Sequence, residues 1–279
     1  MAVLVRYAEI GIKGRNRDKF ELSLVRNIEN CLNEHKVSFT KIRALYGRIL
    51  IETDDECKCL KHVFGIASFS PSIEAGNTIE DAFAASKHLV EKLSEKDSFR
   101  VSCQRMDKKF FLKSQEVCAN LGKLLMDATK AKVKMVKSTV DVMLEIIDGK
   151  IYLLSGRTEG SGGMPMGSQG RVVALIEDSS SVLAALLVMK RGCIIVPAVL
   201  KDADLSLLNE FSCGNAVKPW KISAIEELDE IAEKHHAQAV VVNDTFEKIR
   251  ETNLKSLVLR PLSGLSKEEI KNEMLAMHH

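Results

Sequence analysis

Residues 160–192 read GSGGMPMGSQGRVVALIEDSSSVLAALLVMKRG, and they mark the start of an α/β domain. Residues 160–170 are so dense in glycine that we expect an irregular loop or linker instead of a packed helix or strand. The apolar residues 171–176 predict a buried strand, the polar residues 177–181 a turn, and the apolar residues 182–190 a buried helix. Backbone N–H groups at such a turn are a common phosphate site, although ordinary α/β domains open with the same unit.

Alternating strand and helix patterns continue to the C-terminus and predict a small, doubly wound parallel sheet over residues 171–279. Each expected strand is a short apolar run, and several of these runs are separated by a stretch with helical periodicity. The expected strands are residues 171–176, 194–199, 220–223, 239–242 and 256–260, and the expected helices are residues 182–190, 225–236 and 245–252.

The preceding residues predict two α+β units. In residues 1–75, a strand, a helix capped by Asp18, a strand pair turning at Tyr46-Gly47 and a second helix follow one another in a ferredoxin-like order. Residues 76–159 combine two helices with four strands, the last two joined by a hairpin turn at Asp148-Gly149. The expected strands are residues 2–6, 37–45, 48–52, 98–103, 133–136, 141–147 and 151–154, and the expected helices after the first are residues 58–64, 78–95 and 113–128.

The composition is that of a globular chain, and it excludes several classes of protein. Of the 279 residues 46% are hydrophobic, yet no apolar run approaches the roughly 20 residues of a membrane span, and we expect no signal peptide. The seven cysteines are scattered and form no CxxC pair, so we predict free thiols in a reducing cytoplasm, without a metal site or a redox dithiol. Cys193 is expected in the core, and Cys213, beside a glycine in a loop, is the candidate for an exposed thiol.

Positive charge concentrates in the N-terminal part of the chain. Residues 1–170 carry 27 Lys and Arg against 22 Asp and Glu, whereas the remaining residues carry 13 against 16. Residues 100–137 have a local excess of +7 and include Phe110 and Phe111, a mixture that suits phosphates and stacked bases. The alternative is a solvated lysine-rich face with both phenylalanines in the core. A second basic loop, residues 7–17, modestly favours a polyanionic partner.

Five segments of the chain resemble the tRNA 4-thiouridine synthetase family, the thiamine-biosynthesis-linked tRNA sulfurtransferases. The resemblance runs from end to end, and four of the segments are long and specific. They are RYAEIGIKGRNRDKFELSLVRNI at residues 6–28, FGIASFSPS at 64–72, SFRVSCQRMDKKFFLKSQEVCANLG at 98–122, GSGGMPMGSQGRVVALI at 160–176 and VLRPLSGLSKEEI at 258–270.

The resemblance implies a multidomain fold of α/β and α+β parts. It implies a ferredoxin-like domain over residues 1–75, a THUMP RNA-binding domain over 76–159, a glycine-rich linker over 160–170 and a reduced PP-loop-like domain over 171–279. The implied partner is tRNA, gripped near its acceptor end through phosphate contacts and shape. The implied RNA-contacting residues are Lys13, Arg15, Arg17, Arg100, Arg105, Lys108, Lys109 and Lys113.

In this family ATP adenylates O4 of a tRNA uridine and a cysteine persulfide then displaces AMP, so ATP and Mg²⁺ are the implied cofactors. The family's SGGxDS loop offers glycine amides to the pyrophosphate, but the matching residues 177–181 are one residue shorter and lack both glycines. Glu177 and Asp178 place two carboxylates there, and two like charges about 4 Å apart repel by roughly 4 kcal/mol at an effective dielectric constant of 20. The implied, degenerate nucleotide site comprises Ser179, Ser180, Ser181 and Asp244, unless the serines only cap the helix.

Further departures from the family bear on activity. Residues 192–237 are much shorter than the family's equivalent, and Asn243-Asp244-Thr245 replaces a GDS element. The chain ends at His279, before the segment expected to carry the sulfur-accepting cysteine. We therefore predict a tRNA-binding protein linked to uridine thiolation, with its adenylating activity lost or impaired and no assigned catalytic residue. One alternative is an active ATP-dependent tRNA sulfurtransferase with an unusual loop, served by a sulfur-carrier protein. Another is a purely structural partner that completes a split enzyme by oligomerising with another chain, and a homodimer is a further predicted assembly.

Overall fold

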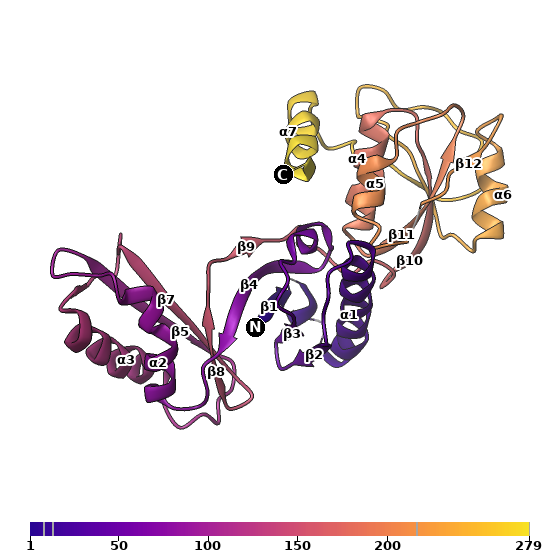
Figure 1. Ribbon diagram of the computed structural model, residues 1–279. Coiled ribbons are helices and arrows are strands. Elements are labelled where there is room, and N and C mark those ends of the chain that lie inside the picture. Colours follow the sequence, from indigo (N-terminus) through magenta and orange to yellow (C-terminus); the bar gives the residue numbers. More distant parts are fainter. Residues whose placement is uncertain (8, 13, 216, 279) are drawn as a thin grey trace. The chain divides into compact units, whose positions relative to one another are not determined.

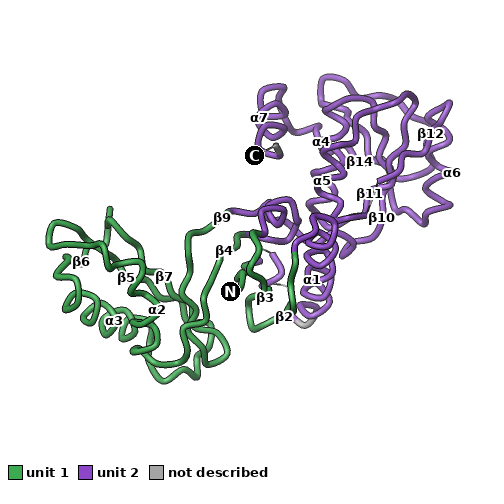
Figure 2. Tube along the Cα trace, in the orientation of Figure 1, with its two compact units in different colours: residues 1–6, 38–56, 68–158 green, residues 7–37, 57–67, 159–279 purple. Residues whose placement is uncertain are grey.

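The computed structural model describes residues 1–7, 9–12, 14–215 and 217–278. The chain divides into two units, each assembled from three segments that lie apart in the sequence (Figure 2). Unit 1 comprises residues 1–6, 38–56 and 68–158, and unit 2 comprises residues 7–37, 57–67 and 159–279.

A mixed sheet forms the centre of unit 1, with the strand order β2-β3-β1-β4-β8-β7-β5-β6 and with β9 paired to β4. The hairpins predicted at Tyr46-Gly47 and Asp148-Gly149 are confirmed, and Asp148 and Gly149 both have the positive φ that such a turn requires. The strands are β1 (Ala2–Tyr7), β2 (Lys41–Leu45), β3 (Arg48–Glu52), β4 (Ile66–Glu74), β5 (Ser98–Arg105), β6 (Lys132–Val133), β7 (Val140–Ile147), β8 (Lys150–Leu154) and β9 (Thr158–Glu159).

Helices α2 (Ile79–Val90) and α3 (Ser114–Thr129) pack against β5, β7 and β8 in unit 1 (Figure 1). The side chains of Ile79, Ala82 and Val90 on α2 are buried, and they share one apolar cluster with the buried face of α3. Thr78 begins α2 as its N-cap, because its hydroxyl accepts the Asp81 N–H at 3.1 Å. The helix ends at Val90, five residues before the predicted end.

The nine-residue strand β4 was not among the predicted strands. Its small polar side chains Ser68, Ser70 and Ser72 are almost completely buried, whereas Pro71 between them is exposed. Hydrophobic periodicity therefore misses this strand, because serine occupies the positions at which an apolar side chain would have signalled a core.

The C-terminal part of unit 2 is a five-stranded parallel sheet with the order β12-β11-β10-β13-β14. Helices α4 and α6 cover opposite faces of this sheet (Figure 1), which confirms the doubly wound parallel fold. The strands are β10 (Gly170–Leu175), β11 (Cys193–Val199), β12 (Trp220–Lys221), β13 (Val240–Val241) and β14 (Val258–Leu259), and the helices are α4 (Ser179–Met189), α5 (Ser206–Glu210), α6 (Glu227–Lys234) and α7 (Lys267–His278).

The helix predicted over residues 245–252 is wrong. This segment instead turns through a bridge between Thr245 and Lys248 and loops back until the Arg250 N–H reaches the Asp244 carboxylate at 3.1 Å. Charged contacts to Asp244 thus override a pattern that looked helical. Helices α5 and α7 were not predicted.

The N-terminal part of unit 2 is built around α1 (Arg17–Glu34), which contacts the short helices η1 (Glu9–Ile12), η2 (Gly14–Asn16) and η3 (Lys58–His62). The cap predicted at Asp18 is wrong, because α1 begins at Arg17 with Asn16 as its N-cap. The Asp18 carboxylate lies in the first turn, where it still favours the positive end of the helix dipole. The helix predicted over residues 58–64 is the 3₁₀ helix η3.

The glycine-rich loop before β10 is docked on its neighbours in unit 2. The Gly162 N–H donates to the Ile66 carbonyl at 2.8 Å, and the Met164 N–H donates to the Lys190 carbonyl at 2.9 Å. A Cβ on Gly160 would clash with the Ile66 backbone, and one on Gly163, whose φ is +73°, would clash with Lys190. Close approach of a neighbouring backbone therefore explains why glycine occupies these two positions.

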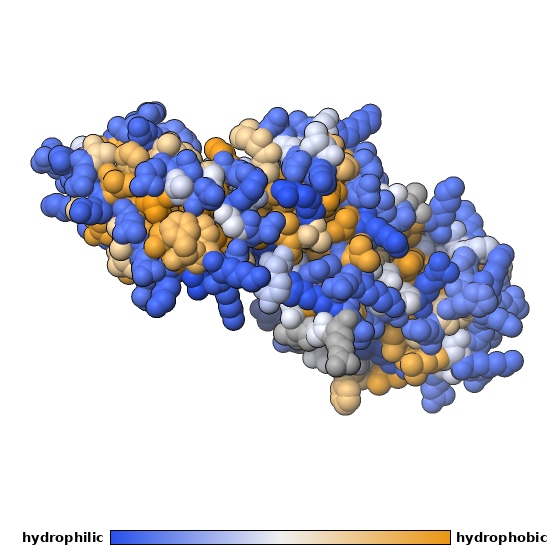
Figure 3. Space-filling view, turned by 90° about the horizontal axis from the view of Figure 1, so that it is seen from below, coloured by the Kyte–Doolittle hydropathy of each residue, from blue (hydrophilic) through white to orange (hydrophobic). Residues whose placement is uncertain are grey.

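Hydrophilic side chains cover most of the face shown in Figure 3, and hydrophobic ones gather there in small groups. The exposed apolar side chains of the chain include the neighbours Val133, Met135 and Val136 beside β6. Among the described residues, no helix is both long enough and apolar enough to cross a membrane.

Candidate functional site

In the turn between β10 and α4, backbone N–H groups and polar side chains form hydrogen bonds with one another. The Asp178 Oδ1 atom caps α4 by accepting the Ser181 N–H at 2.9 Å. The Ser181 hydroxyl oxygen accepts the N–H groups of Glu177 and Asp178 at 2.8 and 2.9 Å. Three backbone N–H groups of the kind that would hold a phosphate are therefore already bonded within the turn. The cap is Asp178, with Ser181 completing it, and Ser180 donates its hydroxyl to Asp178 at 2.7 Å.

An arginine from the loop after β13 closes over this turn. The Arg250 guanidinium donates to Glu177 Oε2, Asp244 Oδ1 and Asn243 Oδ1, each at 2.7 Å. Arg260 donates from Nε to the other oxygen of Asp244 at 3.0 Å. Asp244 is only 3% exposed, so two guanidiniums neutralise a carboxylate that lies in the interior.

Asn243 joins the two strand ends. Its side-chain amide donates to Asp178 Oδ1 at 3.1 Å and to the Ser180 hydroxyl at 3.0 Å, although these residues lie more than 60 positions away in the sequence. One hydrogen-bonded network therefore connects Ser180, Ser181 and Asp244 through Asp178, Asn243 and Arg250, whereas Ser179 is exposed, and the nucleotide site stays a prediction.

The two aspartates of this network are held in their charged form. Burial alone would raise the pKa of Asp178, but hydrogen bonds from Ser180, the Ser181 N–H and Asn243 outweigh burial and lower that pKa below its ordinary value. Burial acts in the same direction on Asp244, and its bonds to Arg250 and Arg260 lower the pKa of Asp244 in net effect. At neutral pH the network therefore contains ionised carboxylates paired with guanidiniums.

A cavity of about 350 Å³ lies beside the start of α4. Glu177, Asp178, Asp202 and Asp204 line it, and none of the other residues that line it in the described part of the chain is a lysine or an arginine. Asp202 and Asp204 therefore add two carboxylates to those of Glu177 and Asp178, which match the family's phosphate-binding loop in the sequence. Such a cavity repels a polyphosphate unless cations accompany it.

Sequence reasoning did not find the two arginines of this network. Arg260 lies in the VLRPL segment that carried part of the resemblance, so a signal for it was present. Arg250 lies in the stretch that was mistaken for a helix, and nothing in its local pattern marked it.

The second candidate site is the loop between β5 and α3 in unit 1. Arg105, predicted to contact RNA, donates to the backbone carbonyls of Leu112 at 2.9 Å and Phe110 at 3.3 Å. Asp107 accepts the Lys109 N–H at 2.8 Å and the Gly149 N–H at 3.0 Å. These bonds fix the loop, and Arg105 is one of its internal supports.

The remaining cations of the loop extend outward. Lys108, Lys109 and Lys113 are exposed, as an RNA-contacting role requires. Phe110 is buried, as the alternative with both phenylalanines in the core predicted, whereas Phe111 is 70% exposed, as a surface for stacked bases requires. Their ring centroids lie 4.6 Å apart. The loop thus presents three ammonium groups beside one aromatic ring.

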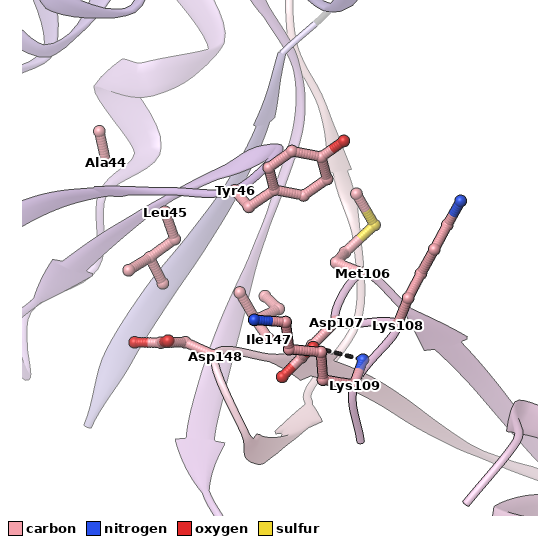
Figure 4. Close-up of a pocket in the computed structure, with 9 residues that line it drawn as sticks. All are labelled: Ala44, Leu45, Tyr46, Met106, Asp107, Lys108, Lys109, Ile147 and Asp148. Carbon is pink, nitrogen blue, oxygen red and sulfur yellow. Dashed lines mark hydrogen bonds between the residues drawn. The ribbon is translucent and has the colours of Figure 1, made fainter. Parts of the chain in front are cut away.

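A pocket of about 640 Å³ lies between this loop, the β2–β3 hairpin and the β7–β8 turn, all in unit 1. Figure 4 shows the Tyr46 ring and Met106 side by side at one side of the pocket. The Lys109 ammonium points into the pocket, whereas Lys108 extends away from it. An aromatic ring, a thioether and a lysine suit a base with its phosphate, and the carboxylates of Asp107 and Asp148 also line this pocket.

The other predicted RNA residues lie elsewhere or are engaged. Arg100 pairs with Asp141 at 2.7 Å in unit 1. In unit 2, Arg17 pairs with Glu21 at 2.7 Å and donates to the Tyr7 hydroxyl. Lys13 lies outside the described residues, and of Arg15 only the backbone is described.

A buried ion triad in unit 1 was not predicted. Arg6 on β1 and Arg48 on β3 each donate from Nε to one oxygen of Glu145 on β7, both at 2.6 Å. Glu145 is 2% exposed and both arginines are buried. Because the partners lie up to 139 positions apart, no local pattern could reveal them.

The exposed thiol predicted at Cys213 is wrong. Cys213 is 2% exposed, and burial raises its pKa to about 12, so it is an unreactive thiol. Cys193, expected in the core, is partly exposed at the start of β11.

Comparison with known proteins matches this geometry to described families. The family model of the ThiI ferredoxin-like domain matches residues 2–70, and that of the THUMP domain matches residues 76–155. A probable tRNA sulfurtransferase of Thermococcus kodakarensis is 30% identical over 324 residues, covering 96% of this chain and 85% of the relative. A probable tRNA sulfurtransferase of Natranaerobius thermophilus is 27% identical and covers 97% of this chain and 81% of the relative.

Two crystal structures share the fold. The chain is similar to PH1313 from Pyrococcus horikoshii with a TM-score of 0.88 and 26% identity, covering 100% of this chain and 99% of that one. It is similar to a 4-thiouridine synthetase in complex with RNA and bound ATP with a TM-score of 0.78 and 24% identity, covering 99% of this chain and 84% of that one.

Proposed function

This chain belongs to the tRNA sulfurtransferase family, and on that premise we propose that it binds tRNA while its turn before α4 does not hold the triphosphate of ATP. Its role then lies in tRNA uridine thiolation, with the adenylation step lost or impaired in this chain. The proposed RNA contacts are Lys108, Lys109 and Lys113, with the pocket beside Tyr46 receiving a base.

One observation carries the proposal for the nucleotide site. The Arg250 guanidinium is bonded to Glu177, Asn243 and Asp244 above a turn whose N–H groups are already used. A triphosphate would have to displace this arginine, break the cap of α4 and approach the carboxylates of Glu177 and Asp178. Each of these steps costs free energy that the family's glycine loop does not require.

The RNA-binding part of the proposal is supported by the loop before α3. Arg105 and Asp107 fix its backbone, so RNA binding has to order only the side chains of the exposed lysines and not the loop that carries them. The THUMP match over residues 76–155 includes the whole loop. We propose that the grip is on phosphates and shape, as in other RNA-binding modules of this kind.

The test is a calorimetric titration with ATP and Mg²⁺, with and without tRNA, beside tRNA binding measured over a range of salt concentrations. We expect tRNA binding that weakens steeply with salt and no heat from ATP. ATP binding that requires tRNA would overturn the nucleotide part and leave the RNA part standing.

A paired variant sharpens the test. Replacing both Glu177 and Asp178 by glycine removes two carboxylates and one of the three side-chain partners of the Arg250 guanidinium, so ATP affinity should rise. Replacing Asp202 and Asp204 by alanine removes the same charge from the same cavity but leaves the turn intact, and should raise the affinity less. Equal effects of the two pairs would show that general charge governs ATP binding there.

A second candidate function is an active ATP-dependent tRNA sulfurtransferase, favoured by the two guanidiniums at the strand ends. Ligands of α/β sheets bind at this edge, and arginine is a good phosphate clamp. In this case Arg250 exchanges its carboxylates for the triphosphate, so the wild type binds ATP and Arg250→Ala abolishes that binding. A homodimer and a sulfur-carrier partner remain predictions that light scattering and a pull-down with labelled sulfur donor would test.

A further inference from the structure

Three side chains that neither candidate site uses meet in unit 2. Cys31 and His35 lie one turn apart on α1, and Cys59 lies on η3. One ligating atom of each, a thiol sulfur or an imidazole nitrogen, lies within 4.8 Å of both others. The prediction of no metal site rested on the lack of a CxxC pair, but here the two cysteines are 28 positions apart and the fold brings them together.

The spacing is close to that of a tetrahedral metal site. The Cys31 Sγ and His35 Nδ1 atoms are 4.0 Å apart. With Zn–S bonds of about 2.3 Å and Zn–N bonds of about 2.0 Å, a sulfur and a nitrogen ligand lie about 3.6 Å apart in a tetrahedron. Movements of well under 1 Å per atom, on the order of a small side-chain rotation, would therefore close the set around an ion. His35 is exposed, and its Nδ1 atom lies 2.9 Å from the Cys31 carbonyl oxygen, so ligation through Nδ1 requires the ring to exchange this hydrogen bond for the ion.

The surroundings suit a soft or borderline cation. Cys31 is 1% exposed and Cys59 is 9% exposed, so a bound ion would be shielded from water on the sulfur side. The Cys31 thiol already contacts the segment that carries Cys59, because it donates to the Cys59 backbone carbonyl with a sulfur–oxygen distance of 3.6 Å. A divalent cation would displace the proton of each thiol and hold both sulfurs as thiolates.

A third segment closes over the cluster without joining it. A Cβ on Gly214 would lie 3.0 Å from the Asn30 carbonyl oxygen, which places the loop after α5 directly on α1. Cys213 in this loop is 2% exposed and does not belong to the set of three residues whose ligating atoms lie within 4.8 Å of one another. The donor set is therefore two thiolates and one imidazole, which Zn²⁺ prefers over hard cations such as Mg²⁺.

We propose that Cys31, His35 and Cys59 bind a Zn²⁺ ion, with water as the fourth ligand, and that the ion fastens η3 to α1. This site is independent of tRNA and of ATP.

The experiment is a titration of the full chain with Co²⁺, in the presence of a non-coordinating reductant, followed by displacement with Zn²⁺. We expect one equivalent of Co²⁺ to give thiolate-to-metal charge-transfer absorption and the intense visible bands of tetrahedral cobalt, both removed by Zn²⁺. His35→Ala changes an exposed residue and should fold, and it should weaken binding at least about tenfold. Cys59→Ser should remove most of the charge-transfer absorption.

The matched control is Cys193→Ser, which removes a partly exposed thiol of the same unit away from the cluster. It should keep the spectrum and the affinity of the wild type. Zn²⁺ should also raise the thermal midpoint of the wild type but not that of His35→Ala. A spectrum of octahedral cobalt, equal affinities of wild type and His35→Ala, or a Cys31–Cys59 disulfide that survives reductant would each overturn the proposal.

Discussion

The turn before α4 and the loop before α3 both gather charge, but they satisfy it differently. At the turn, Arg250 is bonded to Glu177 and Asp244, and the cap uses the backbone N–H groups. In the loop, the bonded residues are the supports Arg105 and Asp107, while the lysines extend into solvent. The comparison teaches that a charged segment is a candidate binding surface only where the fold leaves its charges unused.

The largest effect should come from removing the Asp244 carboxylate, which accepts hydrogen bonds from both Arg250 and Arg260. Asp244→Ala leaves Arg250 and Arg260 without their shared carboxylate, and losing one partner of a buried ionic group costs about 3–5 kcal/mol. Urea unfolding followed by fluorescence reports on this domain, because Trp220 is the only tryptophan of the chain. The control Asp202→Ala breaks an exposed pair with Lys221 and should change stability by under about 0.5 kcal/mol. Equal losses of unfolding free energy in the two variants would show that the ion pairs of Asp244 do not stabilise this site.

The next effect concerns the exposed lysines of the loop before α3. Replacing both Lys108 and Lys109 by alanine should weaken tRNA binding about tenfold or more and flatten the dependence of log affinity on log salt by up to about two units. Replacing Lys92 and Lys96, two exposed lysines before β5, removes the same charge and should leave the slope nearly unchanged. A slope that falls equally for both pairs would mean that only net charge attracts the RNA.

A smaller effect should separate the serines of the turn. Ser181→Ala removes the hydroxyl that accepts two N–H groups and should destabilise the domain by about 1 kcal/mol. Ser179→Ala, at an exposed position of the same turn, should stay within about 0.5 kcal/mol of the wild type. Chemical denaturation of the two variants side by side decides whether Ser181 is part of the cap or replaceable.

The smallest and most specific effect is a pH dependence. The pKa values of Asp178 and Asp244 are lower in the folded chain than the ordinary value. Their contribution to stability is therefore present above about pH 4, the unfolded value, and is lost as pH falls through the folded pKa values. Asp244→Asn should flatten the acid limb of a plot of unfolding free energy against pH. An acid limb identical to that of the wild type would show that Asp244 is not what acid disrupts.

Local pattern was sufficient for much of the fold. The alternation after residue 170 predicted a parallel sheet, and turn chemistry placed the hairpins at Tyr46-Gly47 and Asp148-Gly149. Both features depend on residues that are neighbours in sequence. Strand β4 escaped because its buried face consists of serines, so its pattern does not register as hydrophobic.

The sequence predicted those site residues that lie close together along the chain, but not the contacts between residues far apart in the sequence. The carboxylates of Glu177 and Asp178 and the lysines of the loop were read from the sequence, but the arginine that closes the turn was not. Arg250 reaches Glu177 across 73 positions, and Cys31 reaches Cys59 across 28. A pairing of this kind is a property of the folded chain, and no periodicity announces it.

The buried triad of Arg6, Glu145 and Arg48 has a consequence for how this protein can be divided or recombined. The family models separate residues 2–70 from residues 76–155, yet one carboxylate of the second stretch neutralises two arginines of the first. A fragment holding only the first stretch would strand two guanidiniums in its interior, and the complementary fragment would strand their counter-ion. A THUMP domain taken from a relative would fold stably with residues 2–70 only if it placed a carboxylate at the position of Glu145. The two stretches therefore have to be exchanged together.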